Sequence, residues 1–149
     1  NYSGFDSGKA GNPGDELIRT LGFDSATHYQ FAHFTDMNRE YADIAADAER
    51  EWQRIDSTYT FTFYPHVSVG WDNSPRTGSS PVVRNNTPDA FAEALRKARS
   101  YADSHPDRAP LITINSWNEW TETSYLMPCD KFGYGYLEAV KKVFVDETR

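Results

Sequence analysis

Three long stretches of the sequence carry the apolar periodicity of helices that pack against a sheet. Apolar residues recur every three or four positions over residues 37–55, over residues 91–102 and over residues 134–145. A shorter stretch of the same kind covers residues 15–21. This spacing places the apolar side chains on one face of each helix. The pattern therefore predicts four helices, each with one buried face.

Short runs of β-branched, aromatic or aliphatic residues alternate with these helices and predict strands. They cover residues 23–31, residues 59–64 with a less regular continuation to Val69, and residues 111–114, which we expect to be buried on both faces. Strands that alternate with helices form parallel sheets with right-handed crossovers. Closing a parallel barrel takes eight units and about 250 residues. The α/β pattern thus leaves two possibilities, a small open sheet or the C-terminal portion of a barrel.

The remaining segments are polar and predict caps and loops. Thr35 or Asp36 is placed to cap the second helix, and Thr87 the third. Residues 1–13 are rich in Gly, Ser, Asn and Pro, which predicts a loop. A second polar stretch spans residues 70–86, and loops of this length inside compact domains are usually functional or disordered. Because it holds a Trp, an Asp and an Arg within six residues, we favour a functional loop.

Charge and length narrow the classes of protein to which the chain can belong. A net charge of -7 argues against binding to nucleic acid and to anionic membranes, since both need a basic surface. No apolar run approaches the roughly 20 residues that span a bilayer. The 149 residues correspond to a single domain. The first residue is Asn1 rather than Met, so we expect a piece of a longer protein, and cytoplasmic, periplasmic and secreted locations all stay open.

No metal or cofactor is expected from the sequence. Cys129 is the only cysteine, so it can form neither a disulfide within the chain nor a cysteine-based metal site. The spacing of His28, His33 and His66 matches no standard metal-ligand pattern. We therefore interpret the histidines as hydrogen-bonded or sugar-binding residues.

Polar and aromatic residues are concentrated directly after the three predicted strands, in residues 27–33, 66–76 and 115–122. In parallel α/β folds the carboxyl ends of the strands meet at one edge, where ligands bind. Amides, carboxylates and flat rings together suit a polyhydroxylated ligand. The candidate substrate-binding residues are Tyr29, His66, Trp71, Asp72, Asn73, Arg76, Trp117, Asn118 and Tyr125.

Several of these candidates have a structural alternative. Trp71 and Trp117 either stack on a sugar or close the end of the fold. Asp72 and Arg76 either bind substrate or pair with each other to hold the loop, and Arg76 also suits an anionic sugar.

Glu119 and Glu122 are the candidate catalytic residues. They stand three positions apart, so a helical turn would place their Cβ atoms about 5–6 Å apart. An extended strand would place them roughly 10 Å apart on opposite sides. Glycoside cleavage needs two carboxyl groups, one as an acid for the leaving oxygen and one as a charged partner on the sugar. The alternative is a pair of surface carboxylates in a loop.

Two segments are specific enough to indicate a family. Residues 114–122 (INSWNEWTE), followed by Tyr125, Leu126 and Pro128 and by residues 132–138 (FGYGYLE), resemble the C-terminal signature of glycoside hydrolase family 99-like proteins. These include the WbsX-like proteins of bacterial surface-polysaccharide loci. Residues 70–76 (GWDNSPR) resemble a second signature of the WbsX-like branch. The resemblance runs from about residue 23 onward.

The resemblance implies a (β/α)8 TIM-type barrel, of which residues 1–149 would form the C-terminal part, about three βα units. It also implies an oligosaccharide or polysaccharide substrate and retaining cleavage of α-mannosidic bonds. Glu119 would act as a base on the sugar's own 2-hydroxyl group, and Glu122 as general acid/base. This chain departs from the family pattern at Thr123, where Gly is usual, and at Met127, where Glu is frequent.

Three functions remain open at this level. The first is a glycoside hydrolase of the family 99-like group. The second is a WbsX-like glycosyltransferase in surface-polysaccharide biosynthesis, and the third is a glycan-binding fragment without catalysis. Because part of a barrel leaves strand edges open, we also expect either self-association or pairing with a missing N-terminal barrel half.

Overall fold

The protein is described by a computed structural model that places residues 13–148. The predicted loop over residues 1–13 therefore lies outside the described residues except for Pro13, which already belongs to helix α1 (Pro13–Leu21). The remaining predicted helices appear as α2 (Tyr41–Thr58), α4 (Pro88–Asp103) and α5 (Gly135–Phe144). All four helices expected from the apolar periodicity are present.

The strands that alternate with the long helices are short and pair in parallel, as the sequence pattern predicted. Strand β1 (Ser25–Thr27) pairs with β2 (Thr62–Tyr64), and β3 (His66–Ser68) pairs with β4 (Thr113–Asn115). Only Pro65 separates β2 from β3. The predicted strand over residues 59–64 and its continuation therefore form one extended segment, whose first half pairs with β1 and whose second half pairs with β4.

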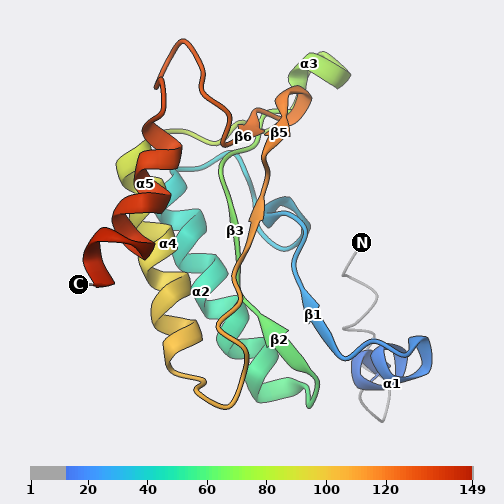
Figure 1. The fold of residues 1–149 in the computed structure, drawn as a ribbon. Coiled ribbons are helices and arrows are strands. Elements are labelled where there is room, and N and C mark those ends of the chain that lie inside the picture. Colours follow the sequence, from blue (N-terminus) through green and yellow to red (C-terminus); the bar gives the residue numbers. More distant parts are fainter. Residues whose placement is uncertain (1–12, 149) are drawn as a thin grey trace.

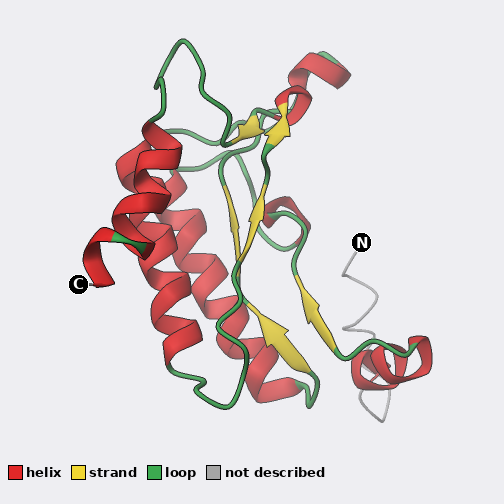
Figure 2. Ribbon diagram, viewed as in Figure 1, coloured by secondary structure: helices red, strands yellow, loops and turns green. Residues whose placement is uncertain are grey.

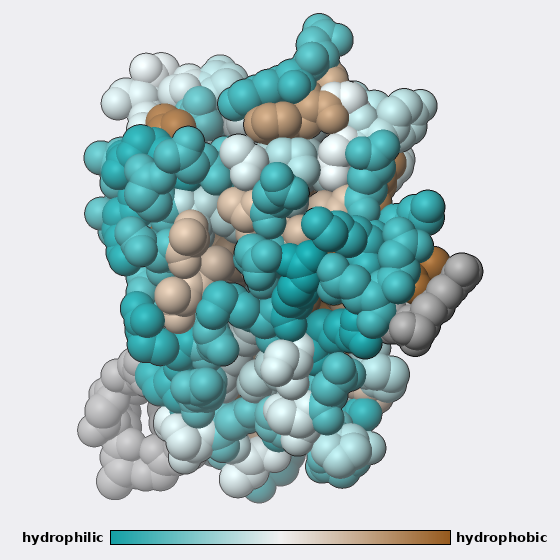
Figure 3. All heavy atoms as spheres, turned by 90° about the vertical axis from the view of Figure 1, so that its left-hand side faces the viewer, coloured by the Kyte–Doolittle hydropathy of each residue, from teal (hydrophilic) through white to brown (hydrophobic). Residues whose placement is uncertain are grey.

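Helices α2, α4 and α5 lie on one side of these strands, and α1 lies beyond β1 (Figure 1, Figure 2). The core fills the space between the two layers. Its largest fully buried side chains include Trp52, Tyr41, Ile44, Phe91 and Leu95. The outward surface of the helices is mostly hydrophilic (Figure 3). The apolar stripes in the sequence thus face the strands, as a helix-on-sheet layer requires.

Short elements gather at the carboxyl ends of β3 and β4 (Figure 1). They are α3 (Ser74–Thr77), β5 (Asn118–Glu119), the 3-10 turn Trp120–Glu122 and β6 (Ser124–Tyr125), and a further 3-10 turn, Phe31–His33, follows β1. A last 3-10 turn, Asp146–Thr148, follows α5. Strands β5 and β6 pair antiparallel, with Glu119 opposite Ser124. The predicted loop over residues 70–86 therefore contains a short helix, and the Trp- and Glu-rich segment forms a small hairpin.

The start of α2 differs from the predicted start. The helix begins at Tyr41, because Thr35 and Asp36 use their side chains in other hydrogen bonds. Thr35 Oγ1 donates to Asp47 Oδ2 at 2.5 Å, and Asp36 Oδ1 accepts from the Asn38 amide at 2.9 Å. Such local side-chain bonds compete with helical backbone bonds. The predicted cap at Thr87 is confirmed, since its side chain accepts from the backbone N–H of Ala90.

The expectation that the third strand is buried on both faces is wrong. Strand β4 begins at Thr113, and Leu111, which precedes it, is 47% exposed. Within residues 13–148, β3 is the only strand that pairs with β4, so one edge of β4 stays open.

Among the helices within residues 13–148, none is both long enough and apolar enough to cross a membrane.

Candidate functional site

A cavity of about 350 Å³ is lined by residues at the carboxyl ends of β1 and β4 and by His66, the first residue of β3. Four of the residues expected to form a site line it together, namely Tyr29, His66, Asn118 and Glu119. They come from three segments that are far apart in the sequence. The structure thus brings residues of the three segments together, although His66 lies at the start of β3 rather than after it.

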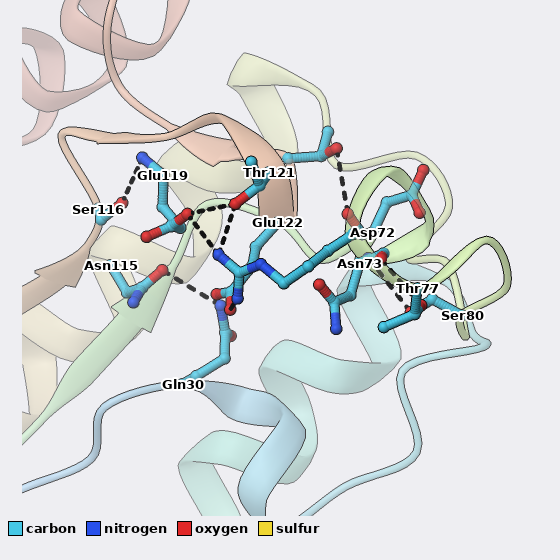
Figure 4. A network of polar contacts seen from close by, with 12 residues as sticks. Gln30, Asp72, Asn73, Thr77, Ser80, Asn115, Ser116, Glu119, Thr121 and Glu122 are labelled. Carbon is cyan, nitrogen blue, oxygen red and sulfur yellow. Dashed lines mark hydrogen bonds and ion pairs between the residues drawn. The ribbon is translucent and has the colours of Figure 1, made fainter.

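Glu119 and Glu122 meet at a single guanidinium group. Arg76 Nη1 donates to Glu122 Oε1 at 2.9 Å, and Arg76 Nη2 donates to Glu119 Oε1 at 3.0 Å. Thr121 completes the group, because its hydroxyl donates to Glu119 Oε1 at 2.6 Å and accepts from Arg76 Nη2 (Figure 4). The two carboxylates therefore point to the same place, as a helical turn over residues 119–122 would allow and an extended strand would not.

Hydrogen bonds of the hairpin hold the Glu119 backbone. Ser116 Oγ accepts from the Glu119 amide at 3.0 Å and donates to the Ser124 carbonyl at 2.7 Å. Ser124 Oγ in turn donates to the carbonyl of Asn115 at 2.8 Å. The peptide bond between Asn115 and Ser116 is cis. Two small hydroxyl side chains thus tie the catalytic candidate to the end of β4.

The two carboxylates differ in burial. The Glu122 side chain is 10% exposed, whereas the Glu119 side chain is 33% exposed. Glu122 Oε2 is buried and has no hydrogen-bond donor within residues 13–148. A buried carboxyl oxygen without a donor is costly unless it carries a proton or meets a ligand. Glu122 is therefore the more enclosed carboxyl group of the pair.

The loop that carries Arg76 is anchored to the Glu122 backbone. The Asp72 amide donates to the Glu122 carbonyl at 2.8 Å. Asp72 Oδ1 accepts from the amide and the hydroxyl of Ser74. Asp72 and Arg76 therefore do not pair with each other. Asp72 accepts hydrogen bonds from Ser74, and Arg76 donates to Glu119 and Glu122. Gly70 fits the same junction, because a Cβ atom there would lie 2.7 Å from the Thr123 carbonyl oxygen.

Trp71 and Asn73 line a second cavity, of about 380 Å³. It lies between this loop and residues 32–37 and does not include Glu119. Asn73 Oδ1 is buried without a donor within the described part of the chain. Trp71 and Asn73 thus belong to a neighbouring surface rather than to the cavity beside Glu119, whereas Arg76 of the same segment contacts Glu119 itself.

Trp117 and Tyr125 stand apart from both cavities. Trp117 is 54% exposed. Tyr125 stacks on Trp120 with ring centroids 4.0 Å apart. The structure therefore leaves the Trp117 ring available for stacking but gives Tyr125 a partner inside the hairpin.

His66 and His28 are buried residues that line the cavity beside Glu119. His66 Nε2 contacts Ser68 Oγ at 2.9 Å, and its Nδ1 contacts Thr113 Oγ1 at 3.0 Å. Burial, followed by the neighbouring histidines, lowers the pKa of His66 from 6.5 to about 3. Burial also lowers the pKa of His28 to about 3. Both rings are therefore neutral at ordinary pH. No three His, Cys, Asp or Glu side chains come together as a metal site within residues 13–148.

Sequence reasoning missed residues that join the three segments. Gln30 is fully buried, and its Nε2 donates to the Gly70 carbonyl at 3.3 Å and to Asn115 Oδ1 at 3.2 Å. It therefore links the end of β1 to the loops that follow β3 and β4. Ser116 and Thr121 were missed as well. Single polar residues of this kind carry no signal in the sequence. The hydrogen-bond partners of Gln30, for example, stand 40 or more residues away from it.

Thr123 occupies a strained position directly after Glu122. Its φ of 51° lies in the left-handed region, which costs a residue other than Gly roughly 1–2 kcal/mol. This is the position at which the family pattern has Gly. Thr123→Gly should raise the free energy of unfolding by about 0.5–1 kcal/mol, since the relieved strain exceeds the added chain entropy of Gly. Urea unfolding at pH 7 measures the difference.

A matched control for this substitution is Thr60→Gly. Thr60 is exposed and has no positive φ, so there the substitution should lower the free energy of unfolding. Equal destabilisation by the two substitutions would contradict the assignment of strain to Thr123.

Comparisons with known proteins agree on a carbohydrate-related group. Residues 14–140 match the family described as "Glycosyltransferase WbsX". The chain is 30% identical, over 105 residues, to the uncharacterized protein WxcX of Xanthomonas campestris pv. campestris, in strain B100 and in strain ATCC 33913. That match covers 69% of this chain and 14% of WxcX, so the chain spans about one seventh of its relative.

Two solved structures of the GH99 endo-alpha-mannosidase from Bacteroides thetaiotaomicron are similar in fold. The structure in complex with BIS-TRIS-propane gives a TM-score of 0.52 at 23% identity, covering 87% of this chain and 42% of that chain. The other gives a TM-score of 0.51 at 26% identity, covering 89% and 40%. Both likenesses extend over most of this chain but less than half of the mannosidase.

Proposed function

Because this chain belongs to the WbsX glycosyltransferase family, we propose that it carries the carboxylate pair of a carbohydrate-active enzyme that cleaves glycosidic bonds. One observation supports this most. Glu119 and Glu122 converge on Arg76 at the carboxyl ends of parallel strands, beside a cavity that Glu119 lines. Two carboxyl groups on one site are what glycosidic cleavage requires.

The proposed roles of the pair follow their difference in burial. Glu122 is the more buried of the two, and Arg76 Nη1 holds its Oε1 in place, as a general acid has to be positioned. Glu119 is more exposed and borders the cavity, where a charged carboxylate meets the sugar. We propose Glu119 as the base on the sugar's 2-hydroxyl and Glu122 as general acid/base, with retention of configuration. The likeness in fold to a GH99 endo-alpha-mannosidase supports an α-mannosidic bond as the first to test.

The proposed substrate is an oligosaccharide or a polysaccharide. The cavity beside Glu119 and the one beside Trp71 measure about 350 and 380 Å³, within the range of small-molecule sites. Tyr29, 57% exposed, and Asn118 offer a ring and an amide at the first cavity. Trp71 and Asn73 offer the same two kinds of group at the second. This combination suits the C–H faces and hydroxyl groups of sugars.

We further propose that residues 1–149 form the C-terminal part of a (β/α)8 barrel. The parallel pairs, the helices on one side of the strands and the match to about two fifths of the mannosidase chains support this. Within residues 13–148, β1 and β4 each pair along one edge only. Strands of an N-terminal barrel half, or of a second copy of the chain, would pair with the open edges.

A glycosyltransferase in surface-polysaccharide biosynthesis is the second candidate. The description of the matching family favours it. In that reaction the same carboxylates would act on the hydroxyl group of an acceptor sugar rather than on water. A third candidate, a glycan-binding piece without catalysis, keeps the cavities and gives the carboxylate pair no chemical role.

Product analysis separates these candidates. The longest natural form of the protein is incubated with α-linked manno-oligosaccharides in H₂¹⁸O, and separately with an activated sugar donor and an oligosaccharide acceptor. A hydrolase yields new reducing ends that carry ¹⁸O and have the α configuration when first formed. Transfer to the acceptor without hydrolysis would overturn the proposed hydrolase in favour of the second candidate. Binding without either reaction would favour the third.

A further inference from the structure

We propose that the cavity beside Trp71 is a second sugar-binding site, which holds a neutral sugar unit of the glycan away from the bond that is cleaved. This inference deepens the proposed function, on which the glycan itself rests. The cavity measures about 380 Å³, in the lower part of the range of small-molecule sites. It shares no lining residue with the cavity beside Glu119, so the two are separate.

The side chain of Asn73 is the clearest sign of a ligand. Its Oδ1 atom is buried and has no hydrogen-bond donor within residues 13–148. Most buried polar atoms are hydrogen-bonded, because an unpaired one costs desolvation free energy. Asn73 directly precedes α3, where an asparagine side chain often caps a helix, but it forms no such hydrogen bond here. The oxygen is therefore open to a donor from a ligand, and a sugar hydroxyl group is such a donor.

The rest of the lining suits a neutral, polyhydroxylated ligand. Trp71 and Pro81 supply apolar surface for the C–H face of a sugar, and Thr77 and Ser79 supply hydroxyl groups. Among the described residues that line the cavity there is no Lys, Arg or His, so no cation balances the charge of a phosphate or an acidic sugar. The one charged residue, Asp36, would repel an anion.

The walls of the cavity are held by backbone hydrogen bonds of the protein itself. The wall formed by residues 32–37 continues to Arg39, whose carbonyl accepts from the Arg84 amide at 2.9 Å. In the loop that forms the other wall, the Trp71 carbonyl accepts from the Val83 amide at 3.0 Å. A ligand therefore meets a preformed site and pays little to order it.

The second cavity lies next to the carboxylate pair without including it. Asp72, which stands between Trp71 and Asn73, donates its amide to the Glu122 carbonyl at 2.8 Å. Figure 4 shows Asn73 on the side of this polar network that is away from Glu119. A sugar unit held by Trp71 and Asn73 would therefore add affinity and select the glycan, while the bond is cleaved elsewhere.

Binding can be measured without any reaction. The longest natural form of the protein, labelled with ¹⁵N at tryptophan and asparagine, is titrated with the methyl glycosides of mannose, glucose, galactose and N-acetylglucosamine. At least one of them should shift the NMR signals of the Trp71 indole and the Asn73 side-chain amide, with saturation in the millimolar range. Inorganic phosphate and glucuronate should not shift them. No saturable shift with any of the neutral glycosides, or an equal shift with either anion, would overturn the proposal.

Asn73→Ala tests the role of the unpaired oxygen. Binding should weaken about tenfold, as expected for the loss of one hydrogen bond to a ligand. The midpoint of urea unfolding should stay where it is, because Oδ1 has no donor in the described chain to lose. Asn86→Ala is the matched control. Asn86 lines neither cavity, and its Nδ2 donates to the Val69 carbonyl at 3.2 Å.

The control should therefore show a lower midpoint of urea unfolding and unchanged binding. An Asn73→Ala variant that binds as well as the unaltered protein, or that loses as much stability as Asn86→Ala, would overturn the proposal.

The result does not depend on whether a glycan is cleaved. Saturable shifts at Trp71 and Asn73 in a protein that neither cleaves nor transfers glycans would support the second site and reject the proposed enzyme. Cleavage without such shifts would support the enzyme and overturn the second site.

Discussion

Glu122→Gln is expected to lower the rate of glycosidic bond cleavage by a factor of about 10³ while the protein stays folded. General acid catalysis by a positioned side chain contributes roughly 10²–10⁴, and an amide cannot deliver the proton. Glutamine keeps the size of the side chain, and its carbonyl oxygen can still accept from Arg76 Nη1. Initial rates on α-linked manno-oligosaccharides measure the loss, and circular dichroism verifies the fold.

Glu119→Gln should reduce the rate comparably, and leaving-group dependence separates the two roles. A substrate whose leaving group needs no protonation, such as a 2,4-dinitrophenyl glycoside, should restore much of the rate to Glu122→Gln. The same substrate should not rescue Glu119→Gln, because the base is still missing. Glu93→Gln is the matched control, since Glu93 is an exposed partner of Arg96 on α4. Full activity of either site variant would contradict the catalytic assignment.

Acid should destabilise the fold strongly between pH 7 and pH 5. Burial lowers the pKa of His28 and that of His66 from 6.5 to about 3. Below pH 6.5 the unfolded chain therefore binds protons that the folded chain does not bind until about pH 3, so stability falls as the pH falls through this window. The expected loss is about 2 kcal/mol for each histidine between pH 7 and pH 5. Urea unfolding at the two pH values measures it.

A variant at one histidine tests the cause of this loss. His66→Gln cannot ionise, and glutamine can still bond to Ser68 and Thr113, the partners of the ring. The variant should therefore lose about half of the pH dependence that the two histidines give. The same pH dependence in His66→Gln as in the unaltered protein would show that other groups cause the acid sensitivity.

The helices and the parallel pairing could be predicted from the sequence, because both follow from local patterns. The apolar stripe of residues 37–55 identified α2, and the cap at Thr87 marked the start of α4. The start of α2 could not be predicted, since Thr35 bonds to Asp47 twelve residues away. The exposure of Leu111 was also missed, because it depends on whether another strand covers β4.

The candidate site could likewise be predicted only in part from the sequence. The spacing of Glu119 and Glu122 gave the pair and left its geometry open between a helical and an extended turn. A short strand followed by a 3-10 turn brings both carboxylates to one side. The two binding surfaces could not be separated from the sequence either. Trp71 and Asn73 border one cavity and Tyr29 and His66 the other, although Trp71 and His66 stand only five residues apart.

The sequence by itself determined roughly where the four long helices and the parallel strands lie, which family motifs are present and which carboxylates are candidates for catalysis. These properties follow from periodicity and from short sequence segments, in which neighbouring residues act on each other directly. Only the tertiary structure decided that Arg76 bridges Glu119 and Glu122 and that Gln30 joins the three segments. Such contacts link residues 40 or more positions apart, and packing of the helices against the strands brings them together.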